Sequence, residues 1–233
     1  MKYLIVNGDD FGASRGINRG IVELHQLGVL TSTSLMIAMP AANDAVSLAR
    51  KAPALGVGLH VTLTHEDGTE LVDFHNDAAC AAEIQRQIAR FSEQLGRLPT
   101  HIDSHQNVHR DQRLRPLFQA AAARYGLPLR EHSPARYFSS FYGQWEGEPH
   151  PEQIGVENLL RMLDGELHDD GITELSCHPG YCEPDFVSPY DAEREIEVRT
   201  LSDKRLRTYL RAKGVKLISF ADVFELSGSA CGA

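Results

Sequence analysis

The chain has one short segment, residues 101–109, that is rich in side chains able to bind metals or move protons. Its candidates are His101, Asp103, His105 and His109. Neutral imidazole is the commonest metal ligand among protein side chains. The apolar–polar alternation from Thr100 predicts a strand end, and Asp111 is a suitable cap for a following helix. A strand that ends in such residues is typical of the active-site edge of an α/β protein.

Two adjacent carboxylates, Asp9 and Asp10, follow the first predicted strand, Tyr3–Val6. Successive residues of an extended chain point to opposite sides, so we expect the two side chains to have different tasks. One could ligate a metal while the other stays free as a general base. Taken alone, the pair could instead be a turn acid and a helix cap.

Two further histidines lie at other predicted strands. His60 belongs to the otherwise apolar strand Val57–Leu63, where a lone histidine is more often a hydrogen-bonded core residue than a ligand. His178 directly follows the strand Thr173–Cys177. Facing a metal it could act as a general acid, because its unperturbed pKa lies near neutrality, whereas buried in the core it would be structural.

Taken together, the histidines and aspartates at these strand ends favour a metal site over core packing. Two histidines and one aspartate bind a divalent metal and leave positions for water. Zinc suits the nitrogen ligands, and magnesium, which keeps several waters, is also compatible. Asp103 or His101 could orient a ligand histidine from behind, since both share strand parity with His105.

Arg130 and the aromatic loop 137–145 are candidates for substrate contact. Arg130 could bind an anionic or hydroxyl-rich ligand, or pair with groups near Glu131. Tyr142 and Trp145 could stack on the apolar faces of a sugar, although the loop could equally be a satellite hydrophobic cluster. The alternating charges of Asp191–Arg199 indicate a solvated helix face.

The elements that must position these residues alternate between strand and helix about seven times. The predicted strands are Tyr3–Val6, Val29–Ala38, Val57–Leu63, one from Thr100, Leu127–Arg130, Thr173–Cys177 and Val215–Ser219. The predicted helices are Arg15–Leu27, Ala41–Arg50, Ala78–Leu95, one ending at Tyr125, Val156–Leu167, Ala192–Ala212 with a break near Ser202, and Asp222–Leu226. Thr64–Asn76 is expected to be a surface loop and Ser133–His150 an irregular working loop.

This alternation predicts parallel strands joined by right-handed crossovers. The favoured architecture is a closed or nearly closed, TIM-like (β/α) barrel, distorted and seven-stranded, with an open doubly wound sheet as the alternative. Polar candidates follow several strands, and a barrel gathers many strand ends at one mouth, whereas an open sheet gathers only those beside its switch point. Residues 1–226 are expected to form one domain and residues 227–233 a flexible tail.

Composition narrows the class of protein. The formal net charge of -9 and the lack of a basic run argue against a nucleic-acid partner. No apolar run approaches the ~20 residues that a membrane helix requires, so stable membrane insertion is not expected. The four cysteines form no CxxC pair and suggest no disulfide framework, which favours a reducing, cytoplasmic location.

Four motifs, in this order, resemble those of the YdjC-like carbohydrate deacetylases, a family of chitooligosaccharide deacetylases and hopanoid-associated relatives. The motifs are Asn7–Gly12, Gly58–His60, Thr100–His105 with Val108–His109, and Ser176–Pro179, and the resemblance covers nearly the whole chain. It implies a (β/α) barrel related to polysaccharide deacetylases, often dimeric, so a homodimer is expected. The implied reaction removes the N-acetyl group of an acetylated sugar or glycolipid.

The resemblance also implies roles for individual residues. One Mg or Zn ion is held by Asp10, His60 and His105. Asp9 matches the position of the base and His178 that of the acid, although adjacent carboxylates can exchange roles. Apart from these implied roles, the residues themselves make His101, Asp103 and His109 the candidates for orienting the ligands.

The chain departs from the family pattern in three places. Gly8 replaces a usual alanine, and Gln106 and Asn107 stand where the family often has two further histidines. The segment between His60 and His105 is shorter than in the chitooligosaccharide enzymes, which argues against chitin oligomers as the substrate. Two alternatives are a metal-dependent hydrolase of another bond, such as a phosphoester, which would need more cationic anchors, and a non-catalytic sugar- or lipid-binding barrel.

Overall fold

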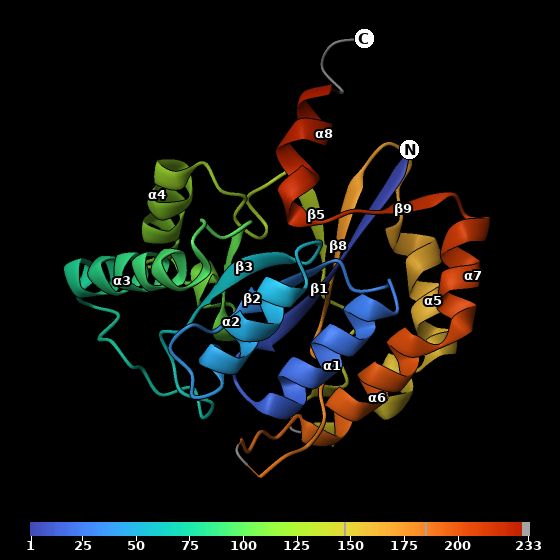
Figure 1. The fold of residues 1–233 in the computed structure, drawn as a ribbon, viewed down its shortest axis with the longest axis horizontal. Helices are drawn as coiled ribbons and strands as arrows, with labels where there is room; N and C mark the ends of the chain where they lie inside the picture. Colours follow the sequence, from blue (N-terminus) through green and yellow to red (C-terminus); the bar gives the residue numbers. More distant parts are fainter. Residues whose placement is uncertain (147, 185, 230–233) are drawn as a thin grey trace.

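The computed structural model describes residues 1–146, 148–184 and 186–229. Its centre is a seven-stranded sheet of parallel pairs in the order β4-β3-β2-β1-β8-β5, with β9 beside the first residues of β1 (Figure 1). The strands are β1 (Lys2–Phe11), β2 (Ser32–Leu35), β3 (Gly56–Val61), β4 (Ile102–Ser104), β5 (Ala135–Phe138), β8 (Ile172–Cys177) and β9 (Val215–Leu217). A separate antiparallel hairpin joins β6 (Gln144–Trp145) to β7 (Glu148–Pro149).

Helices lie along the outside of the sheet (Figure 1). They are α1 (Arg15–Gln26), α2 (Ala42–Lys51), α3 (Asp77–Leu95), α4 (Arg115–Tyr125), α5 (Val156–Glu166), α6 (Asp191–Ser202), α7 (Lys204–Ala212) and α8 (Val223–Ser229), with the short 3-10 helices η1 (His105–Arg110), η2 (Pro151–Ile154) and η3 (Phe220–Asp222). Apolar residues spaced at helical intervals pack inward, as at Ile17, Ile21 and Leu24 of α1. The Ser14 side chain caps this helix, as predicted.

The sheet curls, so that strands far apart in its order face each other across the interior. Arg130 is 1% exposed, and its guanidinium contacts Asp9 on β1, Asp103 on β4 and Glu174 on β8. One side chain can reach β4 as well as the neighbouring strands β1 and β8 only if the sheet wraps around it. The predicted (β/α) barrel is therefore confirmed, in the form of a curled sheet whose ladder runs from β4 to β5.

The structure corrects the predicted strand Leu127–Arg130. This segment makes one parallel bridge, from Leu129 to Ile102, and then turns at Glu131, whose φ is 63°. The strand that joins the sheet is instead β5, inside the segment predicted to be irregular. Two short apolar runs, Leu127–Arg130 and Ala135–Phe138, lie close together here. The second run pairs with β8 and so becomes the strand.

The C-terminal part of the chain follows the prediction more closely. The predicted break near Ser202 is confirmed, since Asp203 separates α6 from α7 and caps α7 by accepting the Arg205 N–H. Residues 227–229 of the predicted tail belong to α8, and residues 230–233 lie outside the described ranges. None of the helices described here combines the length and apolarity needed to cross a bilayer.

Candidate active site

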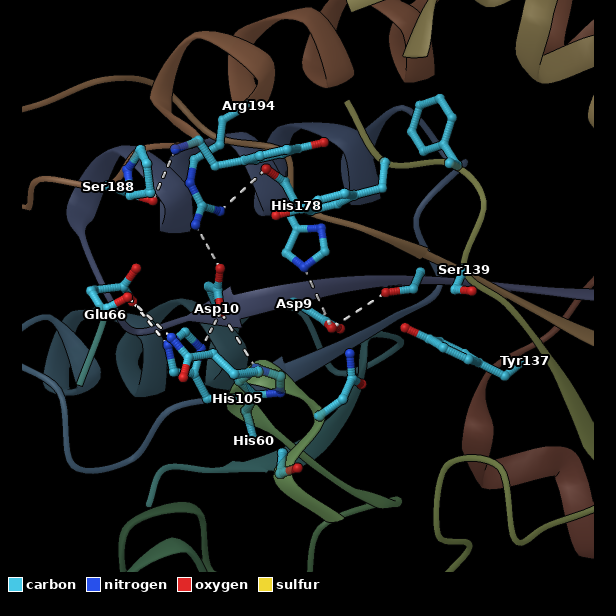
Figure 2. A pocket seen from close by; sticks show the side chains of 18 residues that line it. Asp9, Asp10, His60, Glu66, His105, Tyr137, Ser139, His178, Ser188 and Arg194 are labelled. Carbon is cyan, nitrogen blue, oxygen red and sulfur yellow. Dashed lines mark hydrogen bonds and ion pairs between the residues drawn. The ribbon is translucent and has the colours of Figure 1, made fainter. Parts of the chain in front are cut away.

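The carboxyl ends of β1, β3, β4 and β8 converge on a cavity of about 310 Å³ (Figure 2). Polar side chains from these strand ends form one part of its lining, and aromatic residues another. The lining includes Asp9, Asp10, His60, His105, His178, Tyr137, Phe141, Tyr142, Tyr190 and Arg194. The predicted meeting of several strand ends is thus present, and it brings together five of the predicted metal and catalytic residues.

Both neighbouring aspartates line this cavity, because β1 departs from regular strand geometry at Asp10. The backbone φ of Asp10 is 65°, in the left-handed region, and the pairing of β1 with β2 shifts register between Gly8 and Phe11. Such a bulge re-aims a side chain that regular alternation would send to the other face. The expectation that Asp9 and Asp10 point to opposite sides is therefore wrong, and their partners distinguish them instead.

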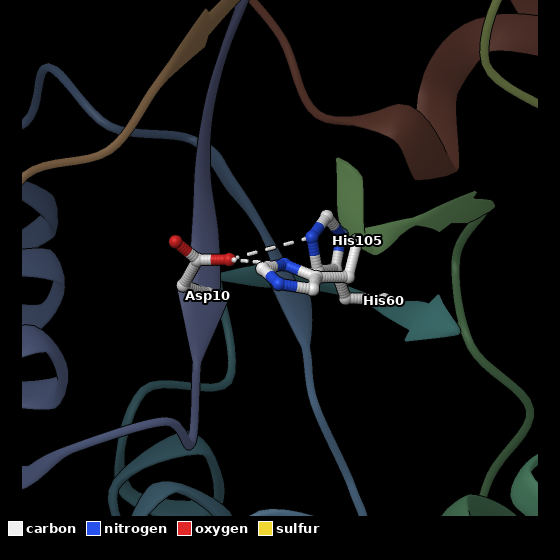
Figure 3. Close-up of side chains that lie close together, drawn as sticks. All are labelled: Asp10, His60 and His105. Carbon is white, nitrogen blue, oxygen red and sulfur yellow. Dashed lines mark ion pairs between the residues drawn. The ribbon is translucent and has the colours of Figure 1, made fainter. Parts of the chain in front are cut away.

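Asp10, His60 and His105 form the group that best fits a metal ion (Figure 3). Their ligand atoms lie within 4.8 Å of one another, and Asp10 Oδ1 is 3.4 Å from both His60 Nε2 and His105 Nδ1. Asp10 Oδ2 accepts a hydrogen bond of 2.6 Å from Arg194, which leaves Oδ1 facing the imidazoles. One carboxylate and two imidazoles are a donor set suited to zinc and other divalent metals.

In a second group in the described part of the chain, Asp9, His60 and Asp103, the ligand atoms also lie within 4.8 Å of one another, but this group fits a cation less well. Arg130 donates to both oxygens of Asp9 at 2.8 Å, and its Nη2 lies 2.9 Å from Asp103 Oδ2. A guanidinium is always protonated, so it would repel a metal ion placed there.

Asp103 lies behind His60, where a residue that orients this ring is expected. Its Oδ1 is 2.8 Å from His60 Nδ1, and its Oδ2 accepts a hydrogen bond of 2.6 Å from the Ser34 hydroxyl. Burial alone would lower the pKa of His60, but the carboxylates of Asp103 and Asp10 raise it to about 10. The contact on Nδ1 turns Nε2 toward Asp10, as metal binding requires.

His101 is buried and does not line the cavity. Its ring stacks on Phe220 with centroids 3.8 Å apart, and its Nε2 lies 3.0 Å from the Ser34 hydroxyl. It therefore reaches the ligands indirectly, through Ser34 and Asp103.

His109 is also buried and also absent from the cavity lining. Its Nδ1 lies 2.7 Å from the Ser104 hydroxyl and its Nε2 lies 3.2 Å from Glu131. Burial lowers the pKa of His109, like that of His101, to about 4. Both rings are thus neutral at neutral pH, and His109 holds the backbone around Ser104 rather than a ligand.

Arg130 lies inside the barrel and not on the cavity wall, so contact with substrate does not fit its position. Besides its two-point contact with Asp9, its Nε donates to Glu174 at 2.8 Å. Burial alone would raise the pKa of Asp9, but Arg130 brings it below its ordinary value. The geometry suits a residue that fixes and ionises Asp9.

His178 lies at the end of β8, with Nε2 3.8 Å from Asp9 Oδ2. Its backbone N–H donates to Glu197 of α6, and its buried Nδ1 has no hydrogen-bond partner within the described ranges. Burial lowers the pKa of His178, and the carboxylates of Asp9 and Asp10 offset this only in part. The neutral imidazole is therefore favoured.

The two aromatic residues predicted to contact substrate, Tyr142 and Trp145, lie in different surroundings. Tyr142 lines the cavity, where its ring stacks on Tyr190 with centroids 4.6 Å apart and meets His178 edge-on at 5.6 Å. Trp145 does not line the cavity; it is 44% exposed and stacks on His150, the residue after β7. Of these two residues, Tyr142 is the one placed to touch a ligand beside His178.

Helix α6 supplies two site residues that the sequence pattern hid. Its charged run was expected to be solvated, yet Glu193, Arg194 and Glu197 are at most 3% exposed. Arg194 binds Asp10, and Glu197 accepts hydrogen bonds from the His178 N–H and the Tyr190 hydroxyl. The spacing of Glu193 and Glu197, four residues apart, marks one helix face, but only packing reveals that this face is buried.

Comparison with known proteins gives matches along almost the whole chain. The model of the YdjC-like protein family matches residues 3–212. A carbohydrate deacetylase from Geobacillus stearothermophilus is 34% identical, over 97% of this chain and 99% of its own. A chitooligosaccharide deacetylase from Serratia marcescens is also 34% identical, over 95% of this chain and 99% of its own.

Solved structures agree with the fold. A candidate cellobiose-phosphate cleavage protein from Enterococcus faecalis superposes with a TM-score of 0.81 at 29% identity, covering 94% of this chain and 97% of that one. A family 4 carbohydrate esterase from Streptomyces lividans, in complex with acetate, gives 0.54 at 15% identity, covering 93% and 91%. The second similarity concerns the fold alone.

Proposed function

Because this chain belongs to the YdjC-like protein family, we propose that its cavity removes the acetyl group of an acetylated sugar with one divalent metal ion, Zn or Mg. The chain is a carbohydrate deacetylase, a hydrolase that acts on N-acetyl amide bonds. The observation that carries the metal dependence is the approach of Asp10, His60 and His105 around one point.

The proposed ligands are chemically suited to this task. A divalent ion bound there would supply Lewis-acid chemistry, polarising the acetamide carbonyl and making water more acidic. Burial alone would raise the pKa of Asp10, but Arg194 and the two imidazoles lower it well below its ordinary value, so the carboxylate is ionised. Two nitrogen ligands favour zinc, whereas magnesium would keep more water.

Asp9 is the proposed general base. It faces the same cavity as Asp10, and the two-point contact with Arg130 holds its carboxylate in one orientation. Its lowered pKa keeps it ionised at neutral pH and ready to accept a proton. As Asp9 takes a proton from water, the water oxygen attacks the carbonyl carbon.

His178 is the proposed donor of a proton to the departing nitrogen. Because its neutral form is favoured, it must first gain a proton, and Asp9 Oδ2 lies 3.8 Å from its Nε2. The proton taken from water can pass from Asp9 to His178 and then to the amine as the C–N bond breaks. The products are acetate and the free amino sugar.

The substrate is proposed to be an acetylated sugar, free or in a glycolipid. Tyr142 presents an aromatic ring beside His178, and aromatic rings stack on the apolar faces of sugars. The homodimer implied by the family resemblance is a further proposal, which sedimentation of the purified chain can check.

The test combines elemental analysis with an acetate-release screen over N-acetyl sugars and sugar lipids. We expect acetate release that is lost after chelation and restored by a divalent ion. Phosphate release instead would favour a phosphoester hydrolase, for which Arg194 is the cation at the cavity wall. Absence of both metal and turnover would favour a sugar- or lipid-binding barrel.

Substitutions then separate the roles of individual residues. Asp9→Asn and His178→Ala should each lower kcat by about 100- to 10,000-fold while the metal stays bound, because each removes a proton-transfer group. His60→Ala should instead lose the metal. Trp145→Ala, outside the cavity, is the control that should keep the wild-type kcat. Full acetate release by Asp9→Asn or His178→Ala would refute the proposed role.

A further inference from the structure

Both histidines of the proposed metal site have a carboxylate behind the ring. His60 turns Nε2 toward Asp10, and its Nδ1 lies 2.8 Å from Asp103. His105 has the reverse orientation, with Nδ1 toward Asp10 and Nε2 3.1 Å from Glu66 Oε1. A carboxylate that accepts the proton of one ring nitrogen leaves the lone pair on the other nitrogen, which can then bind a metal.

The contact between Glu66 and His105 joins a carboxylate oxygen, Oε1, to a ring nitrogen, Nε2. Neither His105 Nε2 nor Glu66 Oε1 has an aligned hydrogen bond within the described ranges, and both atoms are buried. A small rotation of the Glu66 side chain, which is 27% exposed, would complete the bond.

Glu66 is carried by a tight turn. The chain folds back so that Thr64 bridges Glu70 in antiparallel fashion, and the His65 N–H donates to the Thr69 carbonyl at 2.9 Å. These bonds give the turn a defined backbone. The position of the Glu66 carboxylate therefore depends on how the whole turn is held against the barrel.

Gln106 holds this turn next to His105. It directly follows His105, and its side-chain amide donates to the carbonyls of His65 and Glu66 at 3.2 and 3.1 Å. Both Gln106 and Asn107 have a φ of 53°, a left-handed conformation that costs free energy and persists only where the surroundings impose it. The strained residue Gln106 therefore directly follows the proposed ligand His105, and its side chain makes the contact that holds Glu66.

We propose that Glu66 is a positioning residue that orients His105 for metal binding, and that Gln106 holds Glu66 in place. This inference rests on the proposed metal-dependent function. Asp103, the counterpart behind His60, is fully buried, whereas Glu66 lines both the active-site cavity and a neighbouring cavity of about 870 Å³. The orientation of one ligand therefore depends on a surface turn.

The test measures metal affinity on the full chain, apart from turnover. Glu66→Leu removes the acceptor while keeping side-chain bulk, and Glu66→Gln keeps one acceptor oxygen. Loss of such an outer partner typically weakens metal binding about 10- to 100-fold, which is expected for Glu66→Leu in Zn²⁺ competition with a chelator. Glu66→Gln should be intermediate, Gln106→Ala should be weakened less than Glu66→Leu, and the Co²⁺ absorption spectrum should change in the same order.

Glu83→Gln is the matched control, since Glu83 lines the neighbouring cavity and pairs with Arg86, away from His105. It should bind Zn²⁺ like the wild type. Wild-type affinity and an unchanged Co²⁺ spectrum in Glu66→Leu would overturn the inference and leave the proposed function standing. A wild-type chain that binds no divalent ion would overturn both. If Glu66→Leu does not fold, Gln106→Ala decides, with unchanged affinity counting against the inference.

Discussion

At the scale of single residues, the two adjacent aspartates face the same cavity and differ in the side chains that they contact. Arg130 occupies both oxygens of Asp9, while Asp10 keeps one oxygen toward His60 and His105. A carboxylate bound at two points by a guanidinium is poorly placed to ligate a cation as well. This geometry supports Asp9 as the base and Asp10 as the ligand, a choice that the sequence left open.

Proton release on metal binding follows from the state of the two imidazoles. Burial alone would lower the pKa of both histidines. Neighbouring carboxylates instead raise the pKa of His105 to about 9 and that of His60 to about 10 in the metal-free chain. Both rings are then protonated at neutral pH, whereas ligation needs neutral imidazole, so binding should release protons and affinity should rise with pH. Calorimetric titration in buffers of different ionisation enthalpy measures this release. Its absence at neutral pH would contradict these ligands.

At the scale of elements, the sequence identifies what depends on local pattern. Local patterns located β1, β3, β4 and β8, so the candidate residues in or directly after these strands were found, although β1 continues to Phe11, beyond the predicted end at Val6. The bulge at Asp10 depends on pairing with β2, and the buried face of α6 depends on packing against the barrel, so neither could be read locally. Two short apolar runs, Leu127–Arg130 and Ala135–Phe138, lie close together, and the sequence alone does not show which of them joins the sheet. For this reason β5 was not predicted.

Gly58 on β3 gives a test of packing under the site. A Cβ at Gly58 would lie 2.2 Å from Cε1 of His101, whose ring is also stacked on Phe220 and has little room to retreat. Gly58→Ala should therefore lower the free energy of unfolding by about 1–3 kcal/mol, measured by urea denaturation. Gly165→Ala, in open space within α5, is the control and should be neutral or stabilising. Equal stability of both variants would contradict this packing.

At the scale of the whole molecule, the site exists only when the sheet is curled. The proposed ligands come from β1, β3 and the start of η1, the proposed acid follows β8, and Arg194 and Glu197 reach in from α6. Arg130 joins β1, β4 and β8 from the interior. Segments so far apart in the sequence do not form a compact ligand set in an unfolded chain, so metal binding and folding should be coupled.

This coupling predicts thermal stabilisation by zinc. A ligand that binds only the folded state adds roughly 2.7 kcal/mol at a hundredfold excess over its Kd. For a domain of this size each kcal/mol raises Tm by roughly 2–4 °C, so calorimetry should show a rise of roughly 5–11 °C. His105→Ala should lose most of this rise, because it removes one of the proposed ligands, whereas His132→Ala, at an exposed histidine, should keep it. An equal rise in both variants would mean that zinc stabilises the chain from another site.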